Sequence, residues 1–118
     1  MYCLFHHFKL SLDSKVSVIA FTIDNEWNKE VIVRQTIISS GDEPSITKEY
    51  NIDASKTTEF LHLSLKPEEL AASSKFQFIE RETGLLITLP SGEDHIYVNH
   101  HPYRQDYSVT IENASKFL

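Results

Sequence analysis

The sequence predicts a small all-β domain, an antiparallel β-sandwich of about eight or nine short strands. Three observations predict this class. Apolar and polar residues alternate over short runs, as they do in a strand with one buried face. Turn-forming residues separate these runs at intervals of about 8 to 12 residues. Val, Ile, Thr, Tyr, Phe and Trp, which suit a pleated surface, make up roughly a third of the chain. A small closed β-barrel is the alternative architecture.

The first half of the chain contains five candidate strands, at residues 2–12, 16–23, 30–39, 46–52 and 57–65. The first alternates most clearly. One of its faces is apolar apart from His6, and the other is largely polar; the apolar face carries Tyr2, Leu4, Phe8, Leu10 and Leu12, and the other carries Cys3, Phe5, His7, Lys9 and Ser11. A short polar turn at residues 13–15 follows it.

The other four candidates differ in how their apolar residues are distributed. Residues 16–23 are apolar on both faces, which predicts a central strand. In residues 30–39, Val31, Val33 and Ile37 are predicted to point inward, with Arg34 and Thr36 outward. Residues 46–52 place Lys48 on the same face as Ile46, Tyr50 and Ile52, and such an inward lysine is typical of an edge strand. Residues 57–65 carry Leu61, Leu63 and Leu65 on one face and Phe60 and His62 on the other.

The second half contains one helical candidate and the remaining strands. Residues 66–72 hold Pro67 followed by two glutamates, which favours one or two helical turns. Residues 75–80 are predicted to pair with residues 85–89 through a turn at residues 81–84, where Gly84 suits a positive φ. Two further strands are predicted, and the chain ends in an expected tail; these segments are residues 95–99, 105–112 and 113–118. The whole chain, residues 1–118, is predicted to be one domain.

Composition excludes several classes of function. The net charge is −6, and the 11 basic residues are scattered among 17 acidic ones, so we expect no nucleic-acid partner. No apolar run is long enough for a transmembrane segment. The N-terminal residues do not resemble a signal peptide, and the compartment is left open. Cys3 is the single cysteine and forms no internal disulfide. Oligomeric state is likewise left open.

Candidate chemistry is sparse. The six histidines lack the spacing of a zinc site, and we interpret them as partly exposed strand and loop residues. A metal site assembled across strands from His7, His95 and His101 is the alternative. Cys3 beside His6 has no evident source of thiolate activation. The run at residues 91–95 contains triad residue types, but it lies in a turn. We therefore predict no cofactor and no enzymatic activity.

The segment most typical of a binding site is residues 99–107, which concentrates aromatic, basic and acidic side chains between two strands. Its candidate binding residues are His100, His101, Tyr103, Arg104 and Asp106. Tyrosine and arginine are frequent anchors of interfaces. The alternative interpretation is a loop held by its own contacts between Arg104 and Asp106, with Tyr107 in the core. Trp27, in a polar connection, is a further candidate if it is exposed, whereas a buried Trp27 would close one end of the sandwich.

Three functional hypotheses follow. The leading one is a non-enzymatic protein-binding or structural module, such as a subunit of a larger assembly. The second is a small-ligand or carbohydrate-binding domain that uses residues 99–107. The third, a histidine-based metalloprotein, has the least support. A concave pocket lined by His101, Tyr103 and Arg104 would favour a small ligand, and a flat apolar surface would favour a protein partner.

Overall fold

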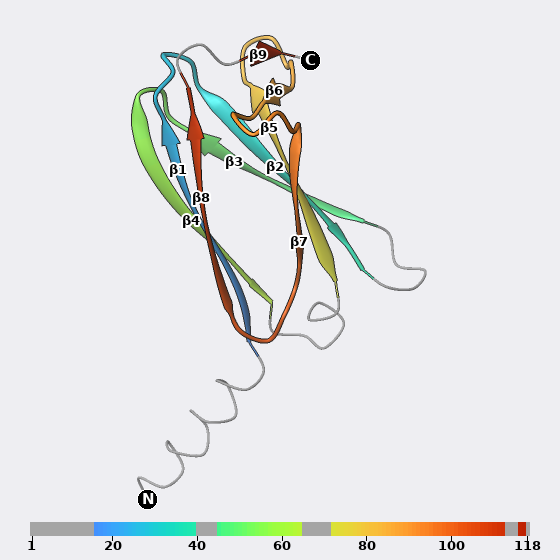
Figure 1. Cartoon of the computed structure of the whole chain (residues 1–118). Helices are drawn as coiled ribbons and strands as arrows, with labels where there is room; N and C mark the ends of the chain where they lie inside the picture. The colour runs from blue at the N-terminus through green and yellow to red at the C-terminus, as the bar shows by residue number, and fades with distance from the viewer. Residues whose placement is uncertain (1–15, 40–44, 65–71, 113–115, 118) are drawn as a thin grey trace, which may run out of the picture.

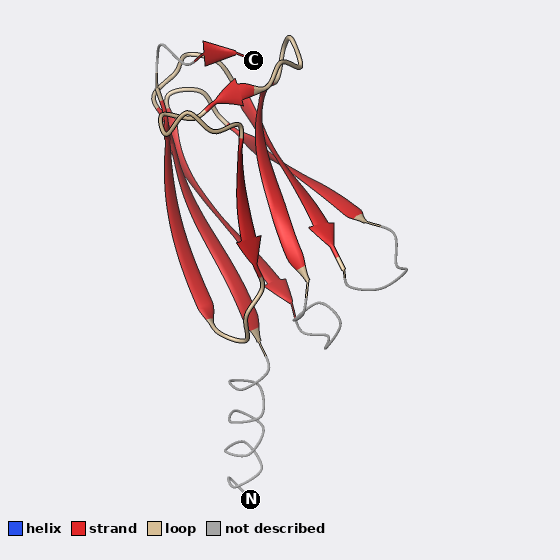
Figure 2. Cartoon of the chain, turned by 45° about the vertical axis from the view of Figure 1, so that its right-hand side comes forward, coloured by secondary structure: helices blue, strands red, loops and turns tan. Residues whose placement is uncertain are grey.

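The computed structural model of the chain describes residues 16–39, 45–64, 72–112 and 116–117. These residues form nine β-strands and no helix. Figure 1 shows the strands arranged in two packed sheets, and Figure 2 shows the same layers from a second direction. The all-β prediction and the β-sandwich are confirmed. The predicted strand at residues 2–12 and nearly all of the helical candidate at residues 66–72 lie outside the described residues, as do residues 40–44.

The first sheet has three strands in the order β4-β1-β8. They span Lys56–Ser64 (β4), Ser17–Asn25 (β1) and Arg104–Ile111 (β8). The central strand β1 pairs antiparallel with β4 and parallel with β8. The apolar residues on both faces of residues 16–23 had predicted a central strand, and this position is confirmed. The inner face of β1 is fully buried, whereas its outer face is only partly covered.

The second sheet has four strands in the order β3-β2-β5-β7. They span Ile46–Ile52 (β3), Val31–Ile38 (β2), Ser73–Glu80 (β5) and His95–Asn99 (β7), and all neighbours are antiparallel. The predicted edge strand is confirmed, since β3 forms one margin of this sheet. Lys48 lies opposite Gln35 on its inner face and is exposed.

The core fills the space between the two sheets. The alternation of β1, β2 and β5 turns their large apolar side chains toward one another, and the inward positions predicted for Val31, Val33 and Ile37 are confirmed. The ring of Phe21 lies at the centre, with its centroid 4.5 Å from that of Phe76. The buried cluster comprises Ile19, Phe21, Ile23, Val31, Val33, Ile52, Phe76, Phe78, Ile87, Leu89, Val98, Val109 and Ile111.

The predicted hairpin between residues 75–80 and 85–89 is only partly present. A turn does join them, with Gly84 at a φ of 76° and its amide donating to the Glu80 carbonyl. Beyond the turn, however, the two segments share a single bridge between Ile79 and Leu86. The reason is that both edges of β5 are already occupied, one by β2 and the other by β7. Residues 85–89 leave the sheet instead.

A third, two-stranded sheet covers one end of the sandwich. It pairs β6 (Ile87–Thr88) with β9 (Lys116–Phe117) in antiparallel orientation. In Figure 1 the two strands lie together near the top of the molecule. β9 falls inside residues 113–118, the predicted tail, and its two residues pair with β6 instead. Ile87 is buried in the core beneath it.

Candidate functional site

The predicted binding segment, residues 99–107, connects β7 of one sheet to β8 of the other. The structure divides its side chains between the interior and the surface. His100 is buried, and its Nε2 lies 2.7 Å from the Ser74 hydroxyl of β5. The backbone amide of His100 also donates to the Ala72 carbonyl at 3.0 Å. His100 is therefore part of the interior and is not exposed to a ligand.

The surface side chains of this segment contact one another. The rings of His101 and Tyr103 stack in parallel planes with centroids 5.1 Å apart, and Tyr103 remains 57% exposed. Arg104 Nε donates to Asp106 Oδ1 at 2.9 Å, and both side chains are largely exposed. Tyr107 stacks on Phe21 at the margin of the core. The contacts proposed in the alternative interpretation of this segment are thus present, although they leave Tyr103 and Arg104 accessible.

A chain of buried polar groups runs from His100 toward the edge strand β3. Ser74 Oγ accepts a hydrogen bond from Gln35 Nε2 at 3.0 Å, and Gln35 Oε1 accepts one from the Tyr50 hydroxyl at 2.8 Å. Burial raises the pKa of Tyr50 above its ordinary value. His62 lies beside His100, with ring centroids 5.5 Å apart. These hydrogen bonds provide partners for polar side chains that face the core. The buried polar groups therefore have a structural role.

Trp27 lies in the connection between β1 and β2. It is partly buried and packs against the hydrophobic core. Its amide donates to Asn25 Oδ1 at 3.1 Å, and its carbonyl accepts from the Ser55 amide at 3.0 Å. Trp27 therefore lies at the end of the sandwich that is opposite residues 99–107, and its contacts hold it there. The structure does not bring these two predicted sites together.

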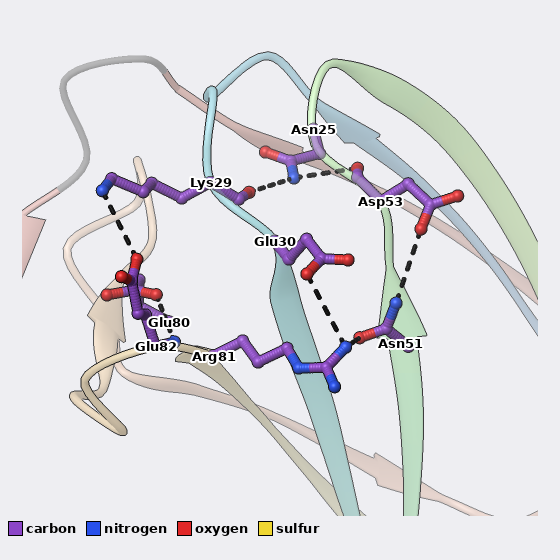
Figure 3. Close-up of polar contacts among 8 residues, drawn as sticks. All are labelled: Asn25, Lys29, Glu30, Asn51, Asp53, Glu80, Arg81 and Glu82. Carbon is purple, nitrogen blue, oxygen red and sulfur yellow. Dashed lines mark hydrogen bonds and ion pairs between the residues drawn. The ribbon is translucent and has the colours of Figure 1, made fainter.

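At this end of the sandwich, polar contacts join the loops into one network (Figure 3). Asn25 is buried, and its Nδ2 donates to the carbonyls of Lys29 and Asp53 at 2.9 and 3.1 Å. Arg81 donates to Asn51 Oδ1 at 3.0 Å and lies 3.6 Å from a carboxylate oxygen of Glu30. The contact between Asn25 and Lys29 is local, and the others join segments that are distant in the sequence. The network therefore fixes the loops relative to the two sheets.

Glu80 anchors the turn at the end of β5. Burial disfavours its charged form, but hydrogen bonds from the Glu82 amide and from the hydroxyl and amide of Thr83, with the charge of Lys29, hold the pKa of Glu80 below its ordinary value. The Glu82 amide lies 2.5 Å and the Thr83 hydroxyl 2.8 Å from the carboxylate. The Glu80 carboxylate therefore accepts hydrogen bonds from residues of its own turn, which argues for a structural role.

The histidines do not converge on a metal centre among the described residues. No group of three or more His, Cys, Asp or Glu side chains lies close enough to hold a metal ion in residues 16–39, 45–64, 72–112 and 116–117. His95 is paired instead with its neighbour Asp94, through Nδ1 and Oδ1 at 2.7 Å. That hydrogen bond is the main cause that lowers the pKa of Asp94. His7 and Cys3, from the other sequence-based candidates, lie outside the described residues.

Sequence reasoning missed the outer face of the β4-β1-β8 sheet. Leu61 and Leu63 of β4 point away from the core, and each is 55% exposed. They lie opposite Ala20 and Val18 of β1, which in turn lie opposite Asp106 and Arg104 of β8. We call Leu61, Leu63, Val18 and Ala20 the outer apolar face. It combines side chains from two strands that are far apart in sequence.

A hollow of about 530 Å³ is set into this sheet beside the outer apolar face. Ala20, Phe60 and Leu61 contribute apolar surface to it, and Glu59, Arg104 and Asp106 contribute charges. Two of the predicted binding residues, Arg104 and Asp106, therefore reach this surface and form its charged margin. An apolar centre bordered by charged groups is the usual composition of a protein-binding surface.

Comparison with known proteins gives no relationship that assigns a function. No protein-family model matches the chain, and neither curated proteins nor solved structures give a significant match. None of the described residues forms a helix that could cross a membrane.

Proposed function

We propose that the chain is a non-enzymatic module that binds a protein partner through the outer apolar face. The observation that carries this proposal is the exposure of Leu61 and Leu63, which lie two residues apart on the same strand. Exposed aliphatic side chains are common one at a time, but a contiguous group with a charged border is more often a contact site. Val18, which is partly exposed, continues the group onto β1, and Ala20 beside it is buried.

The geometry favours a protein over a small ligand at this surface. Strands present their outward side chains as a broad, gently twisted surface, which suits an extended contact. Arg104 and Asp106 would contribute to the border, where charges guide encounter and orientation more than they add affinity. The ion pair that they form with each other costs little to rearrange, because it is exposed to solvent.

A paired-variant capture experiment tests the proposal. The double variant Leu61→Lys/Leu63→Lys changes the outer apolar face, and Ile38→Lys/Thr47→Lys makes the same charge change on exposed positions of the opposite sheet. We expect wild-type protein and the Ile38/Thr47 variant to retain the same protein from the native source. The Leu61/Leu63 variant should lose at least about tenfold of it, because burying lysine in an apolar contact is unfavourable.

Thermal unfolding of all three proteins establishes that each is folded before capture is compared. Equal capture by the two double variants would mean that the outer apolar face does not bind the captured protein. Binding to a glycan array tests the carbohydrate hypothesis. Its variant is Tyr103→Ala, because the Tyr103 ring is exposed on the segment that connects β7 to β8. Glycan binding that depends on Tyr103, without any protein dependent on Leu61 and Leu63, would reverse the proposal.

A further inference from the structure

β8 forms an open edge of the three-stranded sheet. One of its sides pairs with β1 along Arg104–Ile111, and none of the strands formed by the described residues pairs with the other. A hollow of about 620 Å³ lies beside Ser108, Val109 and Thr110, so the described residues leave this part of the edge open. Apolar and polar groups line the hollow together, so its walls do not select an apolar occupant. The feature that it leaves accessible is the strand edge itself.

The hydrogen bonds to β1 show which backbone groups of β8 point to the free side. At one end of the pairing, the Val18 amide donates to the Tyr103 carbonyl at 3.4 Å. At the other end, the Glu26 amide donates to the Ile111 carbonyl at 2.9 Å. Successive residues of a strand direct their backbone groups to opposite edges, so the odd-numbered residues of β8 bond toward β1. Amides and carbonyls therefore point to the free side at the even-numbered residues Arg104, Asp106, Ser108 and Thr110.

β8 lacks the features that ordinarily keep a strand edge from pairing with another chain. Its register with β1 is continuous from Arg104 to Ile111, so it contains no bulge. It contains no proline, and its inward residues are uncharged: Gln105, Tyr107, Val109 and Ile111. The two margins of the other sheet differ from it. β3 carries the exposed, inward Lys48, and β7 is only five residues long.

The charges along β8 are complementary to those of a second copy. Arg104 and Asp106 lie at the start of the strand, and Glu112 follows directly after its end. All three residues are exposed. In an antiparallel pair, the start of one strand lies opposite the end of the other. Two antiparallel copies of β8 therefore bring Arg104 of each chain toward Glu112 of the other, so that opposite charges meet at both ends of the contact.

Backbone pairing and charge together select one register. The even-numbered residues carry the free amides and carbonyls, so they must lie opposite even-numbered residues of the second copy. With the two-fold axis at Ser108, Arg104 lies opposite Glu112 of the second copy, and Asp106 lies opposite its Thr110. Opposite charges in directly facing positions stabilise a strand pair.

Neighbouring registers lack this match. An axis at Asp106 places two aspartates opposite each other, which is unfavourable. An axis at Tyr107 places no charged residue opposite another. An axis at Gln105 places Pro102, which has no amide to donate, opposite Ser108, and so shortens the pairing.

We propose that two copies of the chain dimerise through the free edge of β8, in antiparallel orientation with the two-fold axis at Ser108. The two three-stranded sheets then continue into one. Arg104 Nε donates to Asp106 within the chain at 2.9 Å, and the remaining donors of its guanidinium bind Glu112 of the second copy. Two chains of net charge −6 repel each other at a distance, so these pairs also orient the contact. The inference concerns a different surface from the outer apolar face and does not depend on the proposed function.

Charge exchange tests the partner and the register. Sedimentation velocity of the full chain, over a concentration series at about 0.15 M salt, measures the dimer. Arg104→Glu and Glu112→Arg should each weaken dimerisation at least about tenfold, because each places like charges opposite each other. The double variant Arg104→Glu/Glu112→Arg should regain most of that loss. The control is Arg34→Glu, the same charge reversal on an exposed residue of the other sheet, which should dimerise as wild type does.

Three results would overturn the proposal. The first is a wild-type protein that stays monomeric up to about 1 mM. The second is a double variant that dimerises no better than the single variants, because the two charges would then not face each other. The third is an equal loss in Arg34→Glu, which would show that only the net charge matters.

Hydrogen exchange of single amides, followed by NMR, locates the contact on β8. In dilute protein the amides of Asp106 and Ser108 should exchange fast and those of Tyr107 and Val109 slowly, because only the latter bond to β1. At concentrations that populate the dimer, exchange at Asp106 and Ser108 should slow at least about tenfold. Protection of these two amides already in dilute protein would mean that the same chain covers the edge. Fast exchange in the dimer would place the contact elsewhere, and either result contradicts the proposal.

Two variants of Ser108 test the backbone pairing apart from charge. Ser108→Pro removes an amide that points to the free side, so the protein should still unfold cooperatively on heating but should no longer dimerise. Ser108→Cys in a Cys3→Ser background should form an interchain disulfide, because residues facing each other on the axis have Cα atoms about 5.5 Å apart. The matched control, Leu61→Cys in the same background, should form it at least about tenfold more slowly. Faster linkage through Leu61→Cys would place the contact at β4 and overturn the proposal.

Discussion

Replacing Asn25 with alanine should destabilise the protein more than any other single polar substitution at its end of the sandwich. Asn25 is 1% exposed, and its side chain makes three hydrogen bonds to the backbone. They reach Trp27 and Lys29 in the connection after β1, and Asp53 in the turn between β3 and β4. One amide thus holds two separate loops.

The magnitude follows from these contacts. A hydrogen bond contributes a net free energy of about 0.5 to 1.5 kcal/mol, and a buried group left without a partner costs somewhat more. Loss of the three bonds of Asn25 should therefore lower the free energy of unfolding by about 2 to 4 kcal/mol. Asn25→Asp should cost a comparable amount, since it keeps the acceptor for the Trp27 amide but replaces the donor facing two carbonyl oxygens with a second acceptor.

Urea unfolding monitored by Trp27 fluorescence measures the effect, provided that the slope against denaturant is unchanged. The control is Asn28→Ala, in the same connection but with an exposed side chain, which should change stability by no more than about 0.5 kcal/mol. A cost below about 0.5 kcal/mol for Asn25→Ala would refute the reasoning. Full stability of Asn25→Asp would also refute it, because the donor role of Nδ2 would then be irrelevant.

Three further predictions concern the core, the buried polar chain and the turn after β5. Phe21→Ala should lower the free energy of unfolding by about 3 to 5 kcal/mol in urea titrations, whereas Leu61→Ala should cost less than about 1 kcal/mol, since only Phe21 is buried. Gln35→Leu should cost about 2 kcal/mol by the same measurement, because it leaves the Tyr50 hydroxyl without its partner and removes one of the two hydrogen bonds of Ser74, which keeps its contact with His100. Glu80→Gln should lower the melting temperature at pH 7; because the folded-state pKa of Glu80 is lowered, this difference from wild type should shrink as the pH falls below the ordinary value of 4.5.

Period-two patterning was sufficient to predict most strands, because one buried face imposes alternation whatever the partner strand is. It also placed β1 at the centre of a sheet and β3 at an edge, since apolar residues on both faces and an inward Lys48 reflect how many sides are covered. Pairing was harder to predict. The segment at residues 85–89 follows β5 through a suitable turn, yet β7 occupies the edge that it would need. Local turn chemistry contains no information about such competition.

The candidate site was predicted only in part, because it is assembled from strands distant in sequence. Arg104 and Asp106 were recognised within one short segment, but their neighbours Ala20 and Leu61 come from β1 and β4. His100 was predicted to bind and is buried, because its ring is the last member of a hydrogen-bonded chain through Ser74. No feature of residues 99–107 alone distinguishes an inward histidine from an outward one.

The orientation of β4 explains why Leu61 and Leu63, which carry the proposed function, face outward. Hydrophobicity alone would direct Leu61 and Leu63 inward, yet the inner face of this strand carries Phe60, His62 and Ser64. Phe60 stacks between Phe21 and Tyr50, and His62 hydrogen-bonds with Ser64, so the inner face is well packed without the leucines. The two leucines therefore add little to folding at their exposed positions. Under the proposed function a protein partner would cover them, and the paired-variant capture experiment is directed at them for that reason.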